Sequence, residues 1–148
     1  MSRLLSIYRI IRSIDDASVD RALAAALPTA DRVPKQLAAL LLLQRNRPEG
    51  AIGLIVHFHL LDADLQQAVI THAADLFRPL REAAAQTHGE GPANAMRVIR
   101  RSLSTRLAYL VSEQLRRGTL PLQDRAAECL LHLAQQAMTD PRPGIKPV

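Results

Sequence analysis

The sequence predicts an all-α protein with a single domain over residues 1–138 and a Pro-rich tail or linker over residues 139–148. Leu and Ala dominate the apolar residues, aromatic residues make up only 3% of the chain, and Trp is absent. This composition favours closely packed helices over a sheet rich in branched and aromatic side chains. Apolar residues also recur at intervals of three and four, as on one face of an α-helix. A chain of this length buries roughly 70% of the surface that its unfolded form exposes, which is enough for a core.

Six or seven helices are expected, and the first covers residues 1–14. No acidic residue precedes Asp15, and Arg3, Arg9 and Arg12 flank the apolar positions. A helix places on one side Leu4, Ile7, Tyr8, Ile11 and Ile14. Such a helix can lie on a membrane, serve as a transit peptide or dock on the domain as its first amphipathic helix. We favour docking on the domain.

The next three helices are indicated by caps and by apolar composition. Asp15 or Asp16 is placed to cap the second helix, and Asp31 is placed to cap the third, whose apolar run at 37–43 predicts a central position. The segment 51–61 has branched residues that also suit a buried strand. No second strand is available to pair with it, so a helix is the better prediction.

The segment 61–85 shows the clearest helical pattern in the chain. Asp62 is placed to accept a backbone hydrogen bond of the first turn, and Asp64 adds negative charge at the positive end of the helix dipole. The predicted inner face consists of Leu65, Ala68, Val69, His72, Ala73, Leu76 and Leu80. Pro79 lacks an N–H and clashes with the carbonyl four residues earlier, so we expect a kink or break near Arg78.

Two further helices are predicted at 92–117 and at about 122–138. The first is the longest uninterrupted pattern in the chain, and Pro92 suits its first turn. Its core side consists of Met96, Ile99, Leu103, Leu107, Leu110 and Gln114. The last helix is expected to bury Ala126, Ala127, Leu130, Leu131 and Ala134.

Three segments share an arrangement of two polar residues, Ala and a mostly apolar stretch. They are Val19–Leu27 (VDRALAAAL), Leu65–Ala73 (LQQAVITHA) and, more loosely, Gln123–Leu131 (QDRAAECLL), and the first two lie 46 residues apart. The pattern resembles the first helix of HEAT-type repeats. This resemblance implies a HEAT-like or armadillo-like stack of helix pairs, that is, a short right-handed α-solenoid with a non-catalytic binding surface. The extended, uncapped-looking end at 146–148 leads us to expect that the chain continues into further repeats, as part of a longer protein.

Catalytic and metal-binding patterns are weak. His72 and Asp75 share a helix face, but two ligands do not make a zinc site. Neither a nucleophile elbow nor a phosphate-binding loop is present. The single Cys129 lies in a helical run, where a buried thiol is the ordinary interpretation. We therefore expect no enzymatic activity, no metal and no cofactor.

Basic residues are the better candidates for a binding site, since the formal net charge is +5. Arg97, Arg100 and Arg101 lie at helical spacing without an intervening acid, and Arg45 and Arg47 lie in a predicted loop. A protein is the expected partner. The alternative is electrostatic binding of nucleic acid or an anionic membrane through the Arg-rich helix face, which salt should weaken steeply. No run is apolar enough to span a membrane, and the start lacks a secretory signal, so we expect a cytoplasmic location.

Overall fold

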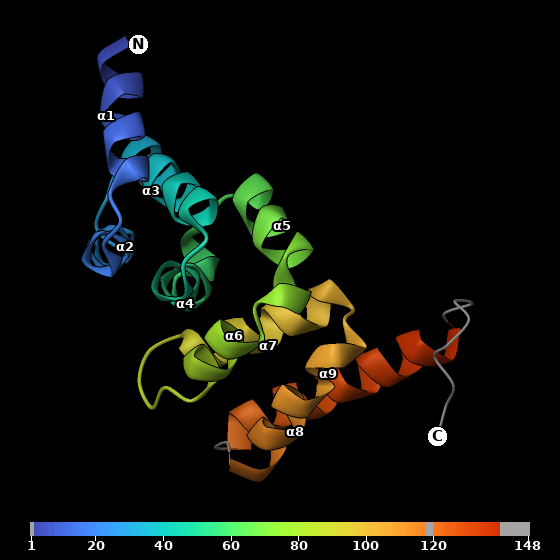
Figure 1. Ribbon diagram of the computed structural model, residues 1–148. Helices are drawn as coiled ribbons and strands as arrows, with labels where there is room; N and C mark the ends of the chain where they lie inside the picture. The colour runs from blue at the N-terminus through green and yellow to red at the C-terminus, as the bar shows by residue number, and fades with distance from the viewer. Residues whose placement is uncertain (1, 118–119, 140–148) are drawn as a thin grey trace.

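The computed structural model describes residues 2–117 and 120–139, and in these ranges the chain is helical, without a strand (Figure 1). The helices are α1 Ser2–Ser13, α2 Ala17–Ala26, α3 Arg32–Arg45, α4 Pro48–Val56, α5 Ala63–Thr71, α6 Phe77–Ala84, α7 Gly91–Ser102, α8 Ala108–Arg117 and α9 Leu120–Thr139. Three short 3-10 helices join them: η1 Phe58–Leu60, η2 Ala73–Asp75 and η3 Thr105–Leu107. The all-α prediction is confirmed. The described part has nine α-helices where six or seven were expected, because two predicted helices each divide.

The segment 61–85 begins as predicted and then breaks earlier than predicted. The Asp62 carboxylate accepts the Leu65 N–H at 3.0 Å, which caps α5. However, α5 ends at Thr71, and α6 begins only at Phe77. Pro79 is the third residue of α6, where the first-turn N–H groups have no partner within the helix. The break therefore precedes Arg78, and Pro79 stands in the one part of a helix that tolerates it.

The prediction of one continuous helix over 92–117 is wrong. Helix α7 ends where Leu103 adopts a left-handed conformation with φ of 56°. The Ser102 hydroxyl donates to the Ile99 carbonyl at 2.7 Å and accepts the Ser104 N–H at 3.2 Å. These local bonds offer the backbone an alternative to the helical ladder, as Ser side chains often do. Leu103, expected in the core, is 38% exposed.

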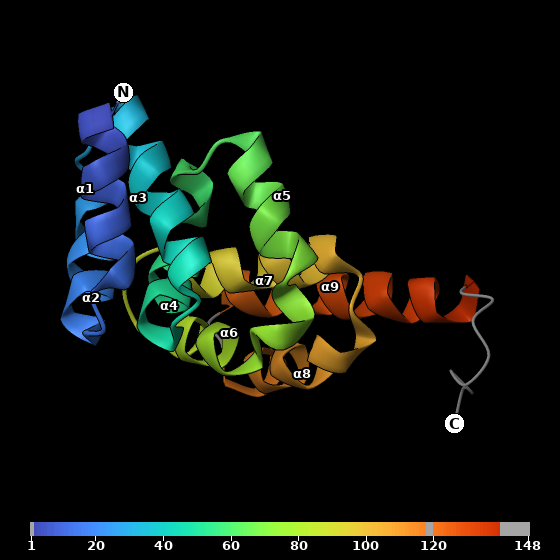
Figure 2. The same cartoon turned by 45° about the horizontal axis from the view of Figure 1, so that its top comes forward.

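Helix α4 confirms the helical prediction for 51–61, although it starts at Pro48. Helix α9 buries only part of the predicted face: Ala126 is buried and Leu130 packs against the core, as expected. Its fully buried residues are Ala126, Cys129 and Leu133, whereas Leu131 is 71% exposed and Ala134 is exposed. Contacts with α7 and α8 decide which face turns inward, and the C-terminal part of α9 projects beyond the other helices (Figure 2). Apart from Thr139, the predicted tail lies outside the described residues.

The helices alternate between two series. In one series α1 contacts α3, α3 contacts α5 and α5 contacts α7; in the other α2 contacts α4, α4 contacts α6 and α6 contacts α8. Figure 2 shows α1, α3 and α5 side by side, with α2, α4, α6 and α8 following one another along the lower part of the view. Within the second series, α2 and α4 approach each other closely at Gly53. A Cβ at this position would clash with the Cβ of Ala24. The core runs through both series into α9.

The first two of the three similar segments found in the sequence do not occupy equivalent places in this arrangement. Val19–Leu27 covers most of α2, whereas Leu65–Ala73 belongs to α5 and η2, so they fall in different series. The 46-residue spacing is therefore not the spacing of the helix pairs. In the described part of the chain, no helix is both long and apolar enough to cross a bilayer.

Candidate functional site

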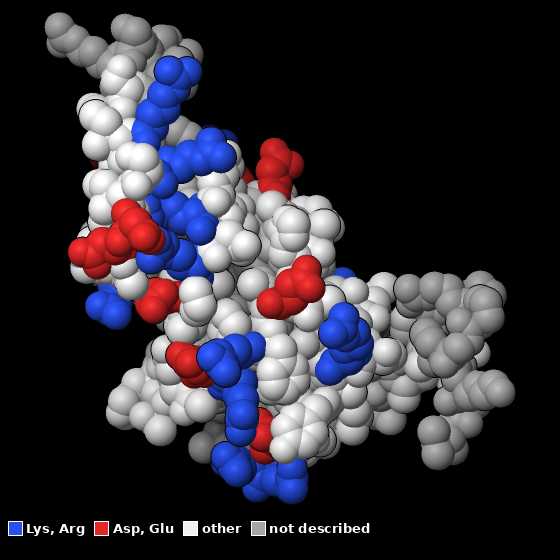
Figure 3. Space-filling model, in the orientation of Figure 1, with Lys and Arg blue, Asp and Glu red and all other residues white. Residues whose placement is uncertain are grey.

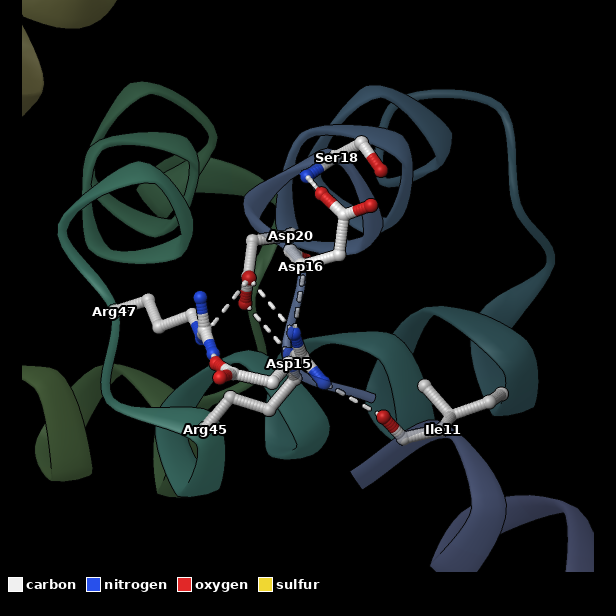
Figure 4. Close-up of polar contacts among 7 residues, drawn as sticks. All are labelled: Ile11, Asp15, Asp16, Ser18, Asp20, Arg45 and Arg47. Carbon is white, nitrogen blue, oxygen red and sulfur yellow. Dashed lines mark hydrogen bonds and ion pairs between the residues drawn. The ribbon is translucent and has the colours of Figure 1, made fainter. Parts of the chain in front are cut away.

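Arg45 is buried, and its contacts with neighbouring helices are drawn in Figure 4. Its Nε donates to Asp20 Oδ1 at 2.8 Å, and the two side chains are 2% and 0% exposed. The same guanidinium donates to the carbonyls of Ile11 at 2.6 Å and Asp16 at 3.1 Å. Arg45 therefore fastens α1 and α2 to α3, and the expectation that it presents charge to a ligand is corrected. The hydrogen bond to Asp20 also raises the pKa of Arg45.

Arg47 belongs to the same cluster. It forms an ion pair with Asp15 and lies 3.8 Å from Asp20, and its side chain is 30% exposed (Figure 4). Two carboxylates therefore already compensate the charge of Arg47. Arg45 and Arg47 together close the junction of α2, α3 and α4.

The predicted patch on α7 divides between two sides of the helix. Arg97 donates to Asn94 Oδ1 at 3.0 Å, and Arg101 donates to Gln66 Oε1 at 3.0 Å. The Arg101 guanidinium also lies 5.6 Å from the centre of the Phe58 ring. Arg97 and Arg101 thus remain exposed cations with neutral hydrogen-bond partners, which lie on α7 itself for Arg97 and on α5 for Arg101. Arg100 turns toward α9, where it lies 3.9 Å from Glu128.

Asn94 is a residue that the sequence did not single out. It is fully buried, and its amide nitrogen donates to the Val56 carbonyl at 2.9 Å and lies 2.9 Å from Nδ1 of His59. This bond holds α7 against the end of α4. Burial lowers the pKa of the adjacent His57, and the neighbouring His59 lowers it further. The sequence signal for Asn94 was weak: a polar residue between two alanines in the first turns of an amphipathic helix.

A groove with a volume of about 580 Å³ lies between α6, α7, α8 and α9. The loop 85–90 forms one wall. Apolar residues of its lining are Ala84, Ala85, Pro92, Ala93, Leu110 and Leu122. Charged residues of its lining are Arg81, Arg117, Arg125, Glu90 and Glu113. We call this cavity the α6–α9 groove.

The charges of the α6–α9 groove are only partly compensated. Arg81 lies 3.7 Å from Glu113, whereas Arg117 and Arg125 form no ion pair with any other described residue. Below them, the buried Gln114 donates to the Ala84 carbonyl at 2.7 Å, which ties α8 to α6. The groove thus combines apolar residues with two guanidinium groups that have no acidic partner in the described part of the chain, and such groups suit carboxylates.

The loop that walls the groove is held close to α6. A Cβ at Gly91 would lie 2.7 Å from Gln86 Oε1 and 2.8 Å from the Ala83 carbonyl oxygen, so only Gly fits there. The residues that build the groove come from four helices spread over 81–125, and no local sequence pattern indicated that they would meet. Within the described residues, no three His, Cys, Asp or Glu side chains converge as a metal site requires.

Comparison with known proteins finds no matching family model, no similar curated protein and no similar solved structure.

Proposed function

We propose that this chain is a non-catalytic helical interaction module that binds an acidic segment of a partner protein in the α6–α9 groove. The observation that carries the proposal is the presence of Arg117 and Arg125, unpaired among the described residues, in the lining of a groove of about 580 Å³. Pockets that take small ligands or side chains have volumes of roughly 300–1,000 Å³. The groove is therefore large enough for several side chains of a peptide.

The charge of the lining supports an acidic partner over a basic one. Three arginines face two glutamates, and Arg81 and Glu113 lie close enough to compensate each other partly. A carboxylate bound between Arg117 and Arg125 gains two charge-assisted hydrogen-bond donors, while apolar side chains cover Leu110 and Leu122. A peptide that alternates acidic and apolar residues satisfies both requirements.

We also propose that the helices form a short α-solenoid of the HEAT-like kind. Successive contacts within the odd-numbered and the even-numbered helices support this arrangement. The helices α1, α3, α5 and α7 begin about 30 residues apart, which is shorter than the 40 to 47 residues of HEAT-type pairs. The proposal therefore rests on the layering and not on the repeat length. We separately propose a cytoplasmic location, as expected from the sequence.

A random peptide display library tests the groove with probes of widely varied sequence. Selection on the intact chain should enrich peptides that contain Asp or Glu beside Leu or Phe. A variant with Arg117→Glu and Arg125→Glu should bind the enriched peptides at least about tenfold more weakly, because two attractive contacts become repulsive.

The matched control carries Arg78→Glu and Arg106→Glu, which change the net charge equally at exposed positions outside the groove lining. This control should bind the peptides within about twofold of the native chain. If both variants lose the same affinity, binding follows net charge and the groove is not the site. If no peptide family is enriched, the proposal is also contradicted.

The alternative function is electrostatic binding of duplex nucleic acid by α7. Arg97 and Arg101 favour it, because both are exposed and have only neutral hydrogen-bond partners. Such binding depends on phosphate contacts and falls steeply with salt. Generic duplex DNA should then bind at low salt, and the triple change Arg97→Ala, Arg100→Ala, Arg101→Ala should abolish that binding. If the native chain does not bind at low salt, the alternative is excluded.

A further inference from the structure

Helix α1 leaves an apolar side in solvent. Ile7 is 54% exposed, Ile10 is 61% exposed and Ile14, directly after the helix, is 40% exposed. Ile11 is half-buried on the side of α3, where its carbonyl accepts the bond from Arg45. The helix thus docks on the domain, as the sequence predicted, but by only part of its apolar surface. The structure describes the backbone of Leu4 and Tyr8 but not their side chains.

The apolar surface continues from α1 onto α3. A cavity of about 210 Å³ lies between α1, α2 and α3, and its lining is entirely apolar: Ile7, Ile11, Leu23, Pro34, Leu37, Ala38 and Leu41. Val33, at the start of α3, is 63% exposed. Single exposed apolar residues are common on protein surfaces, but a cavity bordered by exposed branched side chains is typical of a contact surface.

The charge on α1 is positive and uncompensated within the described residues. Arg9 and Arg12 are exposed and form no ion pair there, and the sequence has no acid before Asp15. The two nearest acids are already engaged, because Asp15 pairs with Arg47 and Asp16 accepts the Ser18 N–H at 2.9 Å as the cap of α2. Figure 3 shows basic side chains gathered over α1 and α3.

We propose that α1 and the adjoining start of α3 dock on the surface of an anionic lipid bilayer. The isoleucines would enter the boundary between headgroups and acyl chains, and Arg9 and Arg12 would lie near lipid phosphates. Interfacial helices bind in this way, through apolar area on one side and basic residues on the polar side. A helix of 12 residues is about 18 Å long, so α1 lies along the surface and does not span the bilayer.

The charge of this surface favours an anionic bilayer over a second copy of the chain or a nucleic acid. A second copy of the chain, paired through the isoleucines, would leave Arg9 and Arg12 on the far side of the helix without a counter-charge. Nucleic acid would be attracted by the arginines but would leave the isoleucines in water. An anionic bilayer satisfies both the charge and the apolar side. The α6–α9 groove lies toward the other end of the molecule, so docking through α1 leaves it accessible (Figure 1).

Vesicle co-sedimentation of the intact chain tests the proposal. The native chain should bind vesicles of phosphatidylcholine mixed with phosphatidylserine and should not bind phosphatidylcholine alone. Arg9→Gln with Arg12→Gln should weaken binding about 30-fold at low ionic strength. Each basic residue near an anionic surface raises the affinity about fivefold, and two such residues are removed. Ile10→Ser should weaken it by roughly tenfold, because less apolar surface is buried.

Two control variants match these changes on other elements. Leu131→Ser removes an exposed apolar side chain from α9, and Arg78→Gln with Arg106→Gln removes two exposed cations. Both controls should bind as the native chain does. Because the sequence has no Trp, Ile10→Trp supplies a single fluorescent reporter whose emission should shift to the blue on anionic vesicles.

Three results would overturn the proposal. The first is absence of vesicle binding by the native chain at about 0.01 M ionic strength, where surface charges are least screened. The second is binding that the α1 variants and the control variants affect equally. The third is a dimer in sedimentation equilibrium that Ile10→Ser dissociates, without vesicle binding, which would assign the surface to a second copy. Thermal unfolding followed by circular dichroism ensures that only folded variants are compared.

Discussion

Replacing Asp20 by Asn leaves the Arg45 guanidinium buried without its counter-charge. Asp20 and Arg45 are joined by bonds of 2.8 and 3.0 Å, and their side chains are 0% and 2% exposed. Removing one partner of a buried ion pair costs about 3–5 kcal/mol, because the other charge stays desolvated. Asn retains a hydrogen-bonding oxygen, so we expect the free energy of unfolding to fall by about 3 kcal/mol, at the lower end of that range. For a chain of this size, that loss lowers the midpoint of thermal unfolding by about 10 °C.

Urea unfolding followed by circular dichroism measures this change. Arg47→Gln is the matched control, because Arg47 approaches the same carboxylate at 3.8 Å but is partly exposed, so it should cost less than about 1 kcal/mol. In the double variant Asp20→Asn with Arg45→Met no uncompensated charge is buried, so it should recover part of the stability. If Asp20→Asn costs less than the Arg47 control, the Asp20–Arg45 pair does not hold the junction and our reasoning is refuted.

Further predictions test other parts of the structure. Gly53→Ala should destabilise the protein by about 1–3 kcal/mol in urea unfolding, because the new Cβ meets Ala24, and adding Ala24→Gly should relieve the loss. Asp62→Ala should cost about 1 kcal/mol in the same assay through loss of the α5 cap, whereas Asp64→Ala should change stability by less than about 0.5 kcal/mol. Burial raises the pKa of Cys129 from 9.0 to about 11, so its thiolate fraction at pH 8 is about 100-fold below that of a free thiol, and labelling by iodoacetamide should be slow until urea unfolds the chain. Because the folded state disfavours the thiolate, Cys129 adds to the free energy of unfolding below pH 9, where the thiol is protonated in both states. This contribution is lost as the pH rises toward 11, and urea titrations across that range would detect the loss.

The arginines show why the candidate site was only partly predictable. Spacing on one helix correctly placed Arg97 and Arg101 on a common exposed side of α7. The spacing did not indicate that Arg45 would form an ion pair with Asp20. The two residues are 25 apart in the sequence, and their contact depends on how α2 packs against α3 and α4. Likewise Arg117 and Arg125 line one groove only because α8 and α9 pack together.

The sequence by itself determined the helical class and two helix starts that depend on local chemistry, those at the Asp62 cap and the Asp16 cap. These features are set by residues within one turn of each other, so no distant contact is needed to predict them. The predicted cap Asp31 precedes α3 but makes no side-chain capping bond. Only the tertiary structure decided which face of α9 is buried and which arginines form ion pairs among the described residues. Such features follow from packing between helices far apart in the sequence, where burial of apolar surface outweighs local helix propensity.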